Sequence, residues 1–347
     1  VASFPLTRGL TRRRTARLFD ICAGFVYTQV LAACVSLNLF EELANEPADI
    51  RTLAARKMMP ADAMARLVRA ATSLDLLEEV GDGRYTLGQL GAAVAGNPAI
   101  SQMTAHHAML YDDIADPVAL LRGEAGDTQL SRFWGYGVSG TPADMPQDRV
   151  REYTRLMSAS QSFISEDALD AYDFGQHTCL MDVGGGNGTF LNAVALRHSD
   201  LKLRLFDLPA VGDEARSLAQ SRGPGQEIEV FGGDFFEDAL PAGADAISLV
   251  RIIHDHDDDR VLKLLANARR ALPESGTLIL VEPLADSQGR DPITDAYFAF
   301  YLLALGSGRA RTFGEIQALL EQSGFTNIRE RGTRRPQLTR LITAQPD

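Results

Sequence analysis

The chain has 347 residues, of which 45% are hydrophobic and 23% charged, a composition that excludes disordered, collagen-like and coiled-coil proteins. The length predicts about two domains. The chain has 46 acidic and 34 basic residues, which gives a net charge of −12. Because so acidic a chain repels phosphate groups, nucleic acid is not expected as a partner. The three cysteines (Cys22, Cys34 and Cys179) are too few for a disulfide framework and lack zinc-site spacing, so they indicate a reducing, cytoplasmic setting without a structural metal.

Near the N-terminus, residues 21–40 contain no charged side chain, and they follow Arg12, Arg13, Arg14 and Arg17. In outline this stretch resembles a signal peptide or a membrane span, but polar residues such as Gln29 and Asn38 interrupt it. We therefore predict one helix over residues 21–40, buried in the interface of a homodimer. A peripheral contact of this helix with the inner membrane is the alternative that stays open.

The remainder of the first hundred residues predicts two helices and a hairpin. Apolar residues at helical spacing indicate helices at 50–57 and 61–74, and Gly81-Asp82-Gly83 separates predicted strands at 76–80 and 84–87. This is the layout of a winged helix. Residues 50–90 hold six basic and five acidic residues, and a net charge of +1 favours a dimerisation module over a DNA-binding domain.

From residue 178 onward, predicted strands alternate with predicted helices, which indicates an α/β domain. Such alternation is typical of a mainly parallel, Rossmann-like sheet with helices on both faces, here with seven strands. The last two strands are too close for a crossover helix and should form an antiparallel hairpin. The expected strands are 178–183, 203–206, 228–231, 245–250, 277–281, 327–331 and 338–344, and the expected helices are 189–198, 210–221, 258–272 and 313–323. We expect a dimerisation domain at 1–100, connecting helices with a substrate lid at 101–170, and a cofactor-binding domain at 171–347.

The strongest local signal is a glycine-rich turn between the first strand and the first helix of this sheet. Gly184, Gly186 and Gly188 alternate after Asp182, whereas a dinucleotide-binding turn would have its third glycine at Thr189. The acid-x-Gly-x-Gly-x-Gly pattern looks like the S-adenosylmethionine loop of class I methyltransferases. An NAD-dependent oxidoreductase is accordingly disfavoured, as is a ligand-sensing winged-helix regulator because of the acidic charge.

Carboxylates follow the next two strands. Asp207 ends the second strand, 207 − 184 = 23 residues after Gly184, where an acid can accept both hydroxyls of a ribose. Asp234 and Phe235 follow the third strand, where a carboxylate can accept the adenine amino group and an aromatic ring can lie against the base. These positions predict an adenosine site at the carboxyl edge of the sheet.

The fourth strand leads into His254, on the same predicted edge. Because imidazole titrates near neutral pH, His254 can take the proton of a hydroxyl group as its oxygen attacks a methyl group. His256 and the acids at 255 and 257–259 could also suggest a metal site. Capping of the following helix and its dipole explain the acids better, so no metal is expected.

Together these motifs identify a family resemblance. Four of them are similar to motifs of the caffeate/hydroxyindole-type O-methyltransferases: Asp182-x-Gly184-x-Gly186, Gly233-Asp234-Phe235-Phe236, Ile253-His254-Asp255 and Leu280-Val281-Glu282-Pro283. The N-terminal layout fits as well, so the resemblance covers nearly the whole chain. It implies a dimer whose N-terminal domains interlock, and S-adenosylmethionine held by Gly184, Gly186, Asp207, Asp234, Phe235 and Arg251.

The resemblance further implies that His254 is the general base and that Glu282 orients it. A second supporting glutamate of the plant enzymes aligns with Ala310, a departure that puts the strength of base catalysis in question. Segments near residues 106–117 and 333–344 resemble the bacterial branch that methylates 1-hydroxycarotenoids. We expect Met157, His107, Trp134 and Tyr301 to contact such a hydrophobic substrate. O-methylation of a phenol or aromatic polyketide and a bacteriochlorophyll-type C-methylation stay open as alternatives.

Overall fold

The computed structural model describes residues 5–133, 161–221, 227–285 and 292–347, and in segments 5–11 and 217–221 it describes the backbone alone. The chain forms two compact units, Val1–Ala108 and Met109–Asp347, and each is considered by itself. The finer division at residues 100 and 170 stays a prediction.

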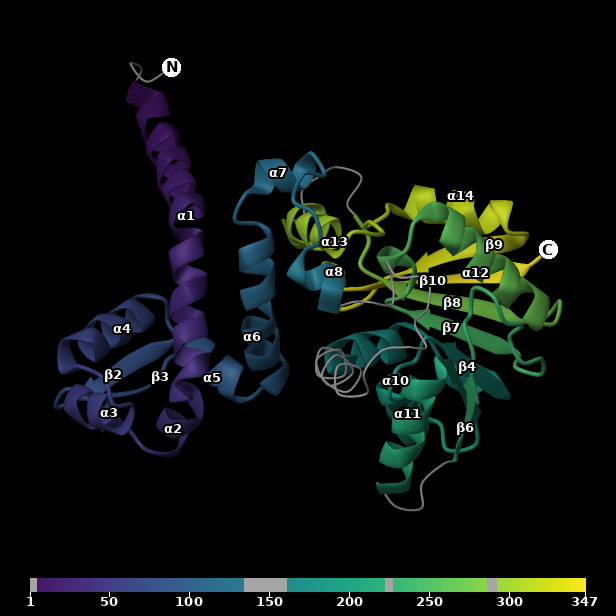
Figure 1. The fold of residues 1–347 in the computed structure, drawn as a ribbon, viewed down its shortest axis with the longest axis horizontal. Helices are drawn as coiled ribbons and strands as arrows, with labels where there is room; N and C mark the ends of the chain where they lie inside the picture. The colour runs from purple at the N-terminus through teal and green to yellow at the C-terminus, as the bar shows by residue number, and fades with distance from the viewer. Residues whose placement is uncertain (1–4, 134–160, 222–226, 286–291) are drawn as a thin grey trace. The chain divides into compact units, whose positions relative to one another are not determined.

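The first unit has the predicted winged-helix layout (Figure 1). Helices α3 and α4 precede a hairpin of β2 and β3, and β1 completes a three-stranded antiparallel sheet in the order β1-β3-β2. The elements are α1 (Pro5–Ser36), α2 (Leu39–Asn45), β1 (Ala48–Asp49), α3 (Ile50–Arg56), α4 (Ala61–Ser73), β2 (Leu77–Gly81), β3 (Arg84–Leu87) and α5 (Gln89–Ala95), followed by α6 (Pro98–Asp113), which continues into the second unit.

The prediction of one helix over residues 21–40 was wrong at both ends. Helix α1 begins at Pro5 and ends at Ser36, and Asn38 adopts a left-handed backbone with φ of 53° before α2 begins. Asparagine tolerates this conformation better than most residues. The reversal lets Leu39 and Phe40 enter the core of the first unit, where both are fully buried.

Most of α1 before that break projects beyond the other elements of its unit (Figure 1). Its large apolar side chains are exposed in the single chain, with 70% of Phe19, 70% of Ile21 and 65% of Phe25 accessible. Within the described residues, segment Arg12–Ser36 is the one helical stretch whose length and composition would allow it to cross a membrane. An exposed apolar surface of this extent needs a partner.

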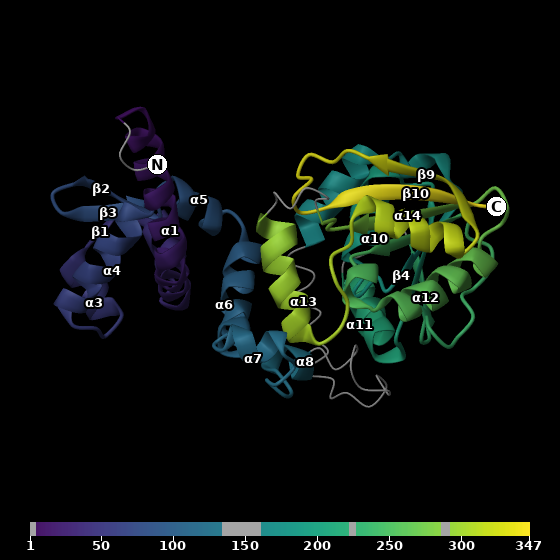
Figure 2. The same cartoon turned by 90° about the horizontal axis from the view of Figure 1, so that it is seen from above.

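The second unit contains the predicted seven-stranded sheet, in the order β6-β5-β4-β7-β8-β10-β9. Neighbours from β6 to β8 pair in parallel, whereas β10 pairs antiparallel with both β8 and β9, as predicted for the final hairpin (Figure 2). The strands are β4 (Cys179–Val183), β5 (Lys202–Asp207), β6 (Ile228–Gly232), β7 (Ala246–Val250), β8 (Thr277–Glu282), β9 (Phe325–Arg331) and β10 (Arg340–Pro346).

Helices cover both faces of this sheet. Side chains alternate between the faces along a strand, so Met181 packs in the core beneath α12 and α14, whereas Leu180 packs in the core beneath α10 and α11. The covering helices are α10 (Thr189–Arg197), α11 (Pro209–Ser221), α12 (Asp258–Ala271) and α14 (Phe313–Gln322). With both faces buried, the strand ends and the loops after them are the places left for chemistry.

The short elements around the sheet complete the unit. They are α7 (Pro117–Leu121), α8 (Gln129–Phe133), the 3-10 turns η2 (Phe174–Gln176) and η3 (Ile253–Asp255), the π-helix η4 (Ile293–Phe298) and α13 (Ala299–Leu305). A π-helix widens the helical turn and is frequent at functional sites. Here η4 contributes Phe298 to the surroundings of His254.

Candidate active site

The glycine turn after β4 brings three strand ends together. The amide of Gly184 donates to the carbonyl of Phe206 at 2.8 Å, which joins the turn to β5. A Cβ atom at Gly184 would lie 2.5 Å from Cδ1 of Ile252 and 3.5 Å from the ring of Phe235. Another residue here would displace the Ile252 side chain and would be strained by the positive φ of 73°, so glycine is favoured.

Asp207 lies at the end of β5 and faces the same turn. Its Oδ2 accepts the amide of Gly186 at 2.8 Å, and its Oδ1 accepts the amide of Leu208 at 2.7 Å. Each oxygen of a carboxylate has a second acceptor site, so the group can still receive two hydroxyl hydrogens. Burial raises the pKa of Asp207 to about 6, and the two amide bonds only partly oppose this rise.

Asp182 is a second buried carboxylate beneath the turn. Its Oδ1 accepts the hydroxyl of Ser248 at 2.6 Å, whereas its Oδ2 has no hydrogen-bond partner among the described residues. Burial raises the pKa of Asp182 to about 7, and the nearby charge of Asp207 adds to this rise. A cationic ligand at this turn would stabilise both carboxylates in their ionised form.

After β6 the chain turns back on itself at Asp234. Oδ1 of Asp234 accepts the amide of Phe236 at 2.8 Å, and the amide of Asp234 donates to Asp238 at the same distance. The rings of Phe235 and Phe236 meet edge to face, with centroids 4.6 Å apart. Both rings are half-buried, so the turn presents a carboxylate and an aromatic edge beside the glycine turn.

His254 lies in the 3-10 turn η3 after β7, and Glu282 at the end of β8 holds its ring. Nδ1 of His254 is 2.6 Å from Oε2 of Glu282, and both side chains are buried. The other oxygen, Oε1, accepts the amides of Ile252 and Ile253, each at 2.8 Å. A carboxylate that receives the Nδ1 hydrogen leaves Nε2 as the nitrogen able to accept a proton.

The two residues after His254 have different surroundings. Oδ1 of Asp255 lies 3.2 Å from Nε2 of His254, and burial raises the pKa of Asp255 to about 6. His256 packs edge to face on Phe235 and Phe236, and burial lowers its pKa to about 3. A neutral imidazole between two phenyl rings makes His256 a packing residue.

The expectation that capping and the helix dipole account for the acids before α12 holds for the dipole, because Asp258 and Asp259 lie in the first turn of that helix, but not for capping. Asp257 occupies the N-cap position without a side-chain capping bond, and its Oδ1 accepts the amide of Gly308 instead. Asp258 pairs with Arg309 and Arg311. Within the part of the chain that the structure describes, no group of three or more His, Cys, Asp and Glu side chains is placed to hold a metal ion.

Aromatic residues lie against the other side of His254. The ring of Phe298 meets the imidazole edge to face at 6.0 Å, and Tyr297 and Tyr301 continue this row of rings at 5.3 and 5.7 Å. The guanidinium of Arg251 lies 5.5 Å from the centroid of Phe298, and Arg251 has a left-handed backbone with φ of 58°. This side of the imidazole is therefore lined by aromatic rings, whereas Glu282 and Asp255 lie at its two ring nitrogens.

The predicted substrate residues have different outcomes. Tyr301 is two rings away from Phe298, as just described, and is buried. His107 lies on α6 in the first unit, where burial lowers its pKa. Trp134 and Met157 lie outside the described residues.

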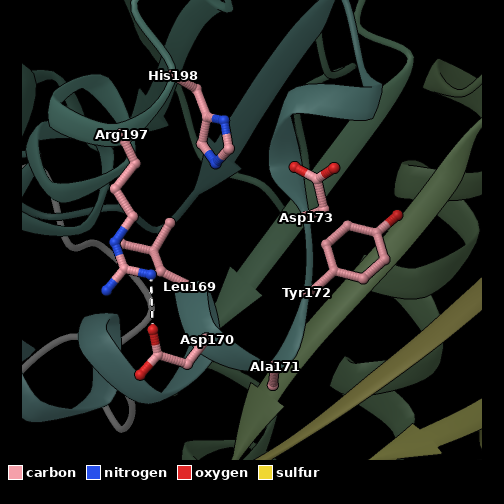
Figure 3. Close-up of a pocket in the computed structure, with 7 residues that line it drawn as sticks. All are labelled: Leu169, Asp170, Ala171, Tyr172, Asp173, Arg197 and His198. Carbon is pink, nitrogen blue, oxygen red and sulfur yellow. Dashed lines mark hydrogen bonds and ion pairs between the residues drawn. The ribbon is translucent and has the colours of Figure 1, made fainter.

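A cavity of about 450 Å³ lies elsewhere, among Leu169, Asp170, Ala171, Tyr172, Asp173, Arg197 and His198 (Figure 3). Arg197 ends α10, and Asp173 precedes β4, which places this cavity at the amino edge of the parallel strands. Its arginine is already paired with Asp170 at 2.7 Å. Gly184, Asp207, Asp234 and His254 lie at the opposite, carboxyl edge of the sheet.

Comparisons with known proteins identify the family. The O-methyltransferase domain matches residues 111–326, and the O-methyltransferase dimerisation domain matches residues 19–96. The chain belongs to the O-methyltransferase family. This confirms the resemblance inferred from the motifs, including S-adenosylmethionine-dependent methyl transfer to oxygen and the presence of a dimerisation domain.

Individual relatives of this O-methyltransferase span nearly its whole length. Demethylspheroidene O-methyltransferases from Cereibacter sphaeroides and Rhodobacter capsulatus are 41% and 40% identical, each over 98% of this chain and over 89% and 84% of their own lengths. The crystal structure of human N-acetylserotonin methyltransferase in complex with S-adenosylmethionine superposes with a TM-score of 0.81 at 24% identity, over 96% of this chain and 97% of that one. The fold class predicted from the sequence is confirmed.

Three features of the site were not found from the sequence. The sequence places Asp255 in a run of acids and in the Ile253-His254-Asp255 motif without a role of its own, and it assigns no role to Phe298 or Arg311. The acidic run did signal a functional segment, but its spacing could not show which acid faces His254. For Arg311 the sequence offers no signal, because two of its acceptors are backbone carbonyls and the third, Asp258, lies 53 positions away in the chain.

Proposed function

We propose that this O-methyltransferase methylates the hydroxyl group of a 1-hydroxycarotenoid. The observation that carries the proposal is the identity of 41% and 40% to two demethylspheroidene O-methyltransferases over 98% of the chain. The phenazine O-methyltransferase of Lysobacter antibioticus, by comparison, is 30% identical over 89% of the chain. The aromatic row beside His254 supports an apolar substrate.

The residues at the carboxyl edge fit S-adenosylmethionine. Asp207 retains acceptor sites for two ribose hydroxyls, and a Cβ at Gly186 would point into open space, so the backbone there can meet a ligand. The Oδ2 of Asp182, which has no hydrogen-bond partner in the described part of the chain, favours a cationic ligand. Asp234, Phe235 and Arg251 follow β6 and β7 at the same edge of the sheet, with Phe235 beside Gly184, and complete the proposed binding residues. When bound, the cofactor supplies an electrophilic methyl group on a sulfonium.

The chain's own part in the reaction is to move one proton. In the proposed step Nε2 of His254 takes the hydroxyl proton of the substrate while the oxygen forms its bond to the methyl group. Glu282 receives the Nδ1 hydrogen and fixes the ring, and its two bonds from backbone amides hold the carboxylate in turn. The resulting imidazolium lies between the carboxylates of Glu282 and Asp255, which stabilise its charge.

Methyl-labelled S-adenosylmethionine and a panel of substrates would test the proposal. The panel contains 1-hydroxycarotenoids, phenols and chlorins, each presented in detergent micelles. We expect label on the carotenoid hydroxyl, with kcat/KM at least about tenfold above that of any phenol, a difference of about 1.4 kcal/mol in activation free energy. Labelling of a phenol or a chlorin alone would contradict the substrate class and leave the family assignment intact.

We further propose that the enzyme is a homodimer in which the exposed face of α1 is buried by the partner. The dimerisation-domain match begins at residue 19, within α1, and Phe19 and Phe25 are exposed apolar residues of that helix. Light scattering should give twice the chain mass for the wild type and the chain mass for the double variant Phe19→Glu/Phe25→Glu. Arg66→Glu, on the exposed face of α4, is the matched control and should stay dimeric.

A lipid surface is the other occupant that this apolar helix would fit. Flotation with anionic vesicles distinguishes burial of α1 by a second subunit from binding of α1 to lipid. A monomeric wild type that floats with the vesicles would overturn the dimer proposal. Under that outcome the peripheral inner-membrane location considered from the sequence would gain support, since arginines 12–14 precede the apolar segment.

A further inference from the structure

We propose that Arg311 is a positioning residue for His254: it holds the turn η3 at its carboxyl end and so fixes the imidazole toward the substrate. The inference rests on the proposed role of His254 as the base. It concerns a residue that contacts neither the imidazole nor the glycine turn, and that acts through the backbone of the loop between β7 and α12.

The turn that carries His254 is weakly held by its own hydrogen bonds. The amide of Asp255 reaches the carbonyl of Ile252 at 3.3 Å, and the amide of His256 reaches that of Ile253 at 3.4 Å. Both distances lie beyond the usual range for such bonds. The residue that leads into the turn, Arg251, already has a left-handed backbone. Other groups must therefore hold the turn in place.

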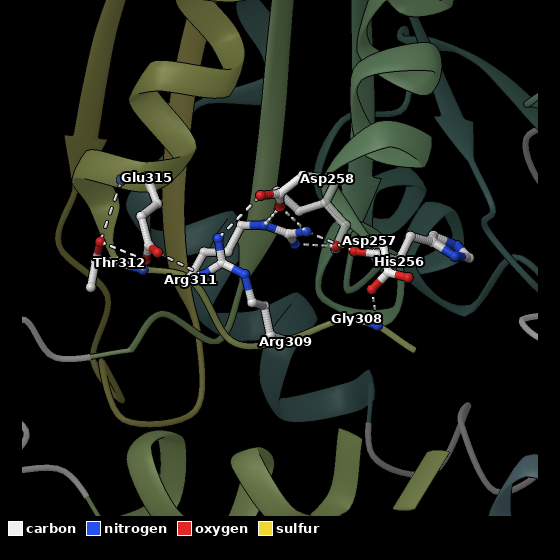
Figure 4. A network of polar contacts seen from close by, with 9 residues as sticks. His256, Asp257, Asp258, Gly308, Arg309, Arg311, Thr312 and Glu315 are labelled. Carbon is white, nitrogen blue, oxygen red and sulfur yellow. Dashed lines mark hydrogen bonds and ion pairs between the residues drawn. The ribbon is translucent and has the colours of Figure 1, made fainter. Parts of the chain in front are cut away.

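Glu282 holds the amides that lead into the turn. Arg311 holds two of its carbonyls, and Figure 4 shows this arginine near His256 and Asp258. Nη1 of Arg311 donates to the carbonyl of Ile253 at 2.6 Å, and Nη2 donates to the carbonyl of His256 at 2.7 Å. These two carbonyls bracket His254 and Asp255. The amides at the beginning of the turn thus meet an anion, and the carbonyls on either side of the pair His254-Asp255 meet a cation.

The guanidinium is suited to this task by burial and by its own support. Arg311 is 2% exposed, and its Nε donates to Oδ1 of Asp258 at 2.8 Å, which compensates its charge. The planar guanidinium donates hydrogen bonds to three acceptors in a fixed geometry. A lysine ammonium at this position could not reach all three acceptors with the same geometry. Loss of the guanidinium would leave two buried carbonyls without these donors.

The backbone of Arg311 is tied to the strand that carries Glu282. Leu284 and Arg311 form a parallel bridge, and the amide of Ala285 donates to the carbonyl of Arg311 at 3.0 Å. Glu282 and Arg311, the two residues that hold the turn, are therefore both anchored at or just after the end of β8. Ser307 adds a third contact, because its hydroxyl donates to the carbonyl of Asp255 at 2.8 Å.

A double-mutant cycle tests the proposal. Arg311→Gln should lower kcat about 10–100-fold, because a displacement of about 1 Å costs on the order of 10²-fold in rate. The affinity for S-adenosylhomocysteine should change less than about twofold, and Arg311→Lys should recover part of kcat. In the His254→Ala background the same Arg311→Gln change should cost almost nothing more. If Arg311→Gln lowers kcat by the same factor in the His254→Ala background as in the wild type, Arg311 does not act through His254.

Arg309→Ala is the matched control. Arg309 pairs with Asp258 and Glu315 in the same network (Figure 4), but its side chain is 46% exposed and, within the described part of the chain, makes no hydrogen bond to the turn. It should retain wild-type kcat. If Arg311→Gln does not fold, Asp258→Asn removes the anion that supports the guanidinium and should give a smaller fall in kcat. Wild-type kcat in both Asp258→Asn and Arg311→Lys would overturn the proposal.

A second measurement needs no substrate, so it separates this inference from the substrate assignment. The Nδ1 hydrogen of His254, held by the buried Glu282, should give a downfield, slowly exchanging proton resonance that is absent in His254→Ala. Arg309→Ala should retain this resonance, and Arg311→Gln should lose or shift it. An unchanged resonance in a folded Arg311→Gln variant would contradict the positioning role even if no carotenoid is methylated.

Discussion

Oδ1 of Asp255 lies 3.2 Å from Nε2 of His254, on the side of the ring opposite the Glu282 contact. The imidazole is thus placed between two buried carboxylates, although Ala310 stands where a second supporting glutamate was expected. Asp255 follows His254 directly in the chain, and its carboxylate would stabilise the imidazolium that the proposed proton transfer forms.

We expect Asp255→Asn to lower kcat about tenfold, equivalent to about 1.4 kcal/mol of activation free energy. The amide retains the shape of the side chain but loses the charge that stabilises the imidazolium. Steady-state kinetics at saturating substrate provides the measurement, with Asp257→Asn as the neighbouring control. A variant that retains full kcat would mean that Asp255 only fills space beside the ring.

His254→Ala should lower kcat by about 10²–10⁴ and leave the affinity for S-adenosylhomocysteine nearly unchanged. The proposed proton acceptor is lost, whereas the glycine turn and Asp207 keep their geometry. His198→Ala is the control, because His198 lies at the opposite edge of the sheet (Figure 3). If the variant retains more than about a third of kcat with chemistry rate-limiting, proximity alone drives the reaction.

Asp207→Ala should weaken S-adenosylhomocysteine binding by about 1.5–3 kcal/mol, or roughly 10–150-fold. The substitution removes the acceptor of two ribose hydroxyls and frees the amide of Gly186. Titration calorimetry measures the change, and Asp213→Ala, on the exposed face of α11, should bind like the wild type. Tighter binding of NAD than of S-adenosylmethionine by the wild type would contradict the assignment of the whole turn.

The affinity of the wild type for S-adenosylhomocysteine should increase as the pH rises from about 5 to about 8. Burial raises the pKa of Asp207 to about 6 and that of Asp182 to about 7, so both are partly protonated in the free protein within this window. The ligand favours the ionised carboxylates, so binding should release protons and strengthen as pH rises. Calorimetry in two buffers of different ionisation enthalpy counts these protons. Proton uptake at pH 6 would reverse the expected sign.

Gly308→Ala should lower both the melting temperature and kcat. A Cβ there would lie within van der Waals overlap of the carbonyl of His254, and the backbone φ of 75° disfavours any side chain. We expect a loss of about 1–3 kcal/mol in the free energy of unfolding. Gly314→Ala is the control, because its Cβ meets open space in the first turn of α14. Equal melting temperatures for the two variants would contradict the close packing at Gly308.

The sequence by itself determined the sheet and the edge where its functional residues gather. Hydrophobic runs of strand length marked all seven strands, with boundaries off by two residues in β9 and β10 and by one residue at most in the others. The carboxyl ends of parallel strands share one edge, so Gly184, Asp207, Asp234 and His254 could be placed together before any coordinates were known. The order of strand ends along the chain was sufficient for this inference.

Only the tertiary structure decided how these residues are held. Asn38 reverses the chain so that Leu39 and Phe40 are buried, and residue type alone did not place that break. Arg311 reaches the carbonyl of Ile253 across 58 positions of sequence, and a carbonyl acceptor is available at every residue. Periodicity and spacing report which face of an element is apolar. They do not report which buried donor meets which backbone acceptor, because that depends on the packing of segments distant in the chain.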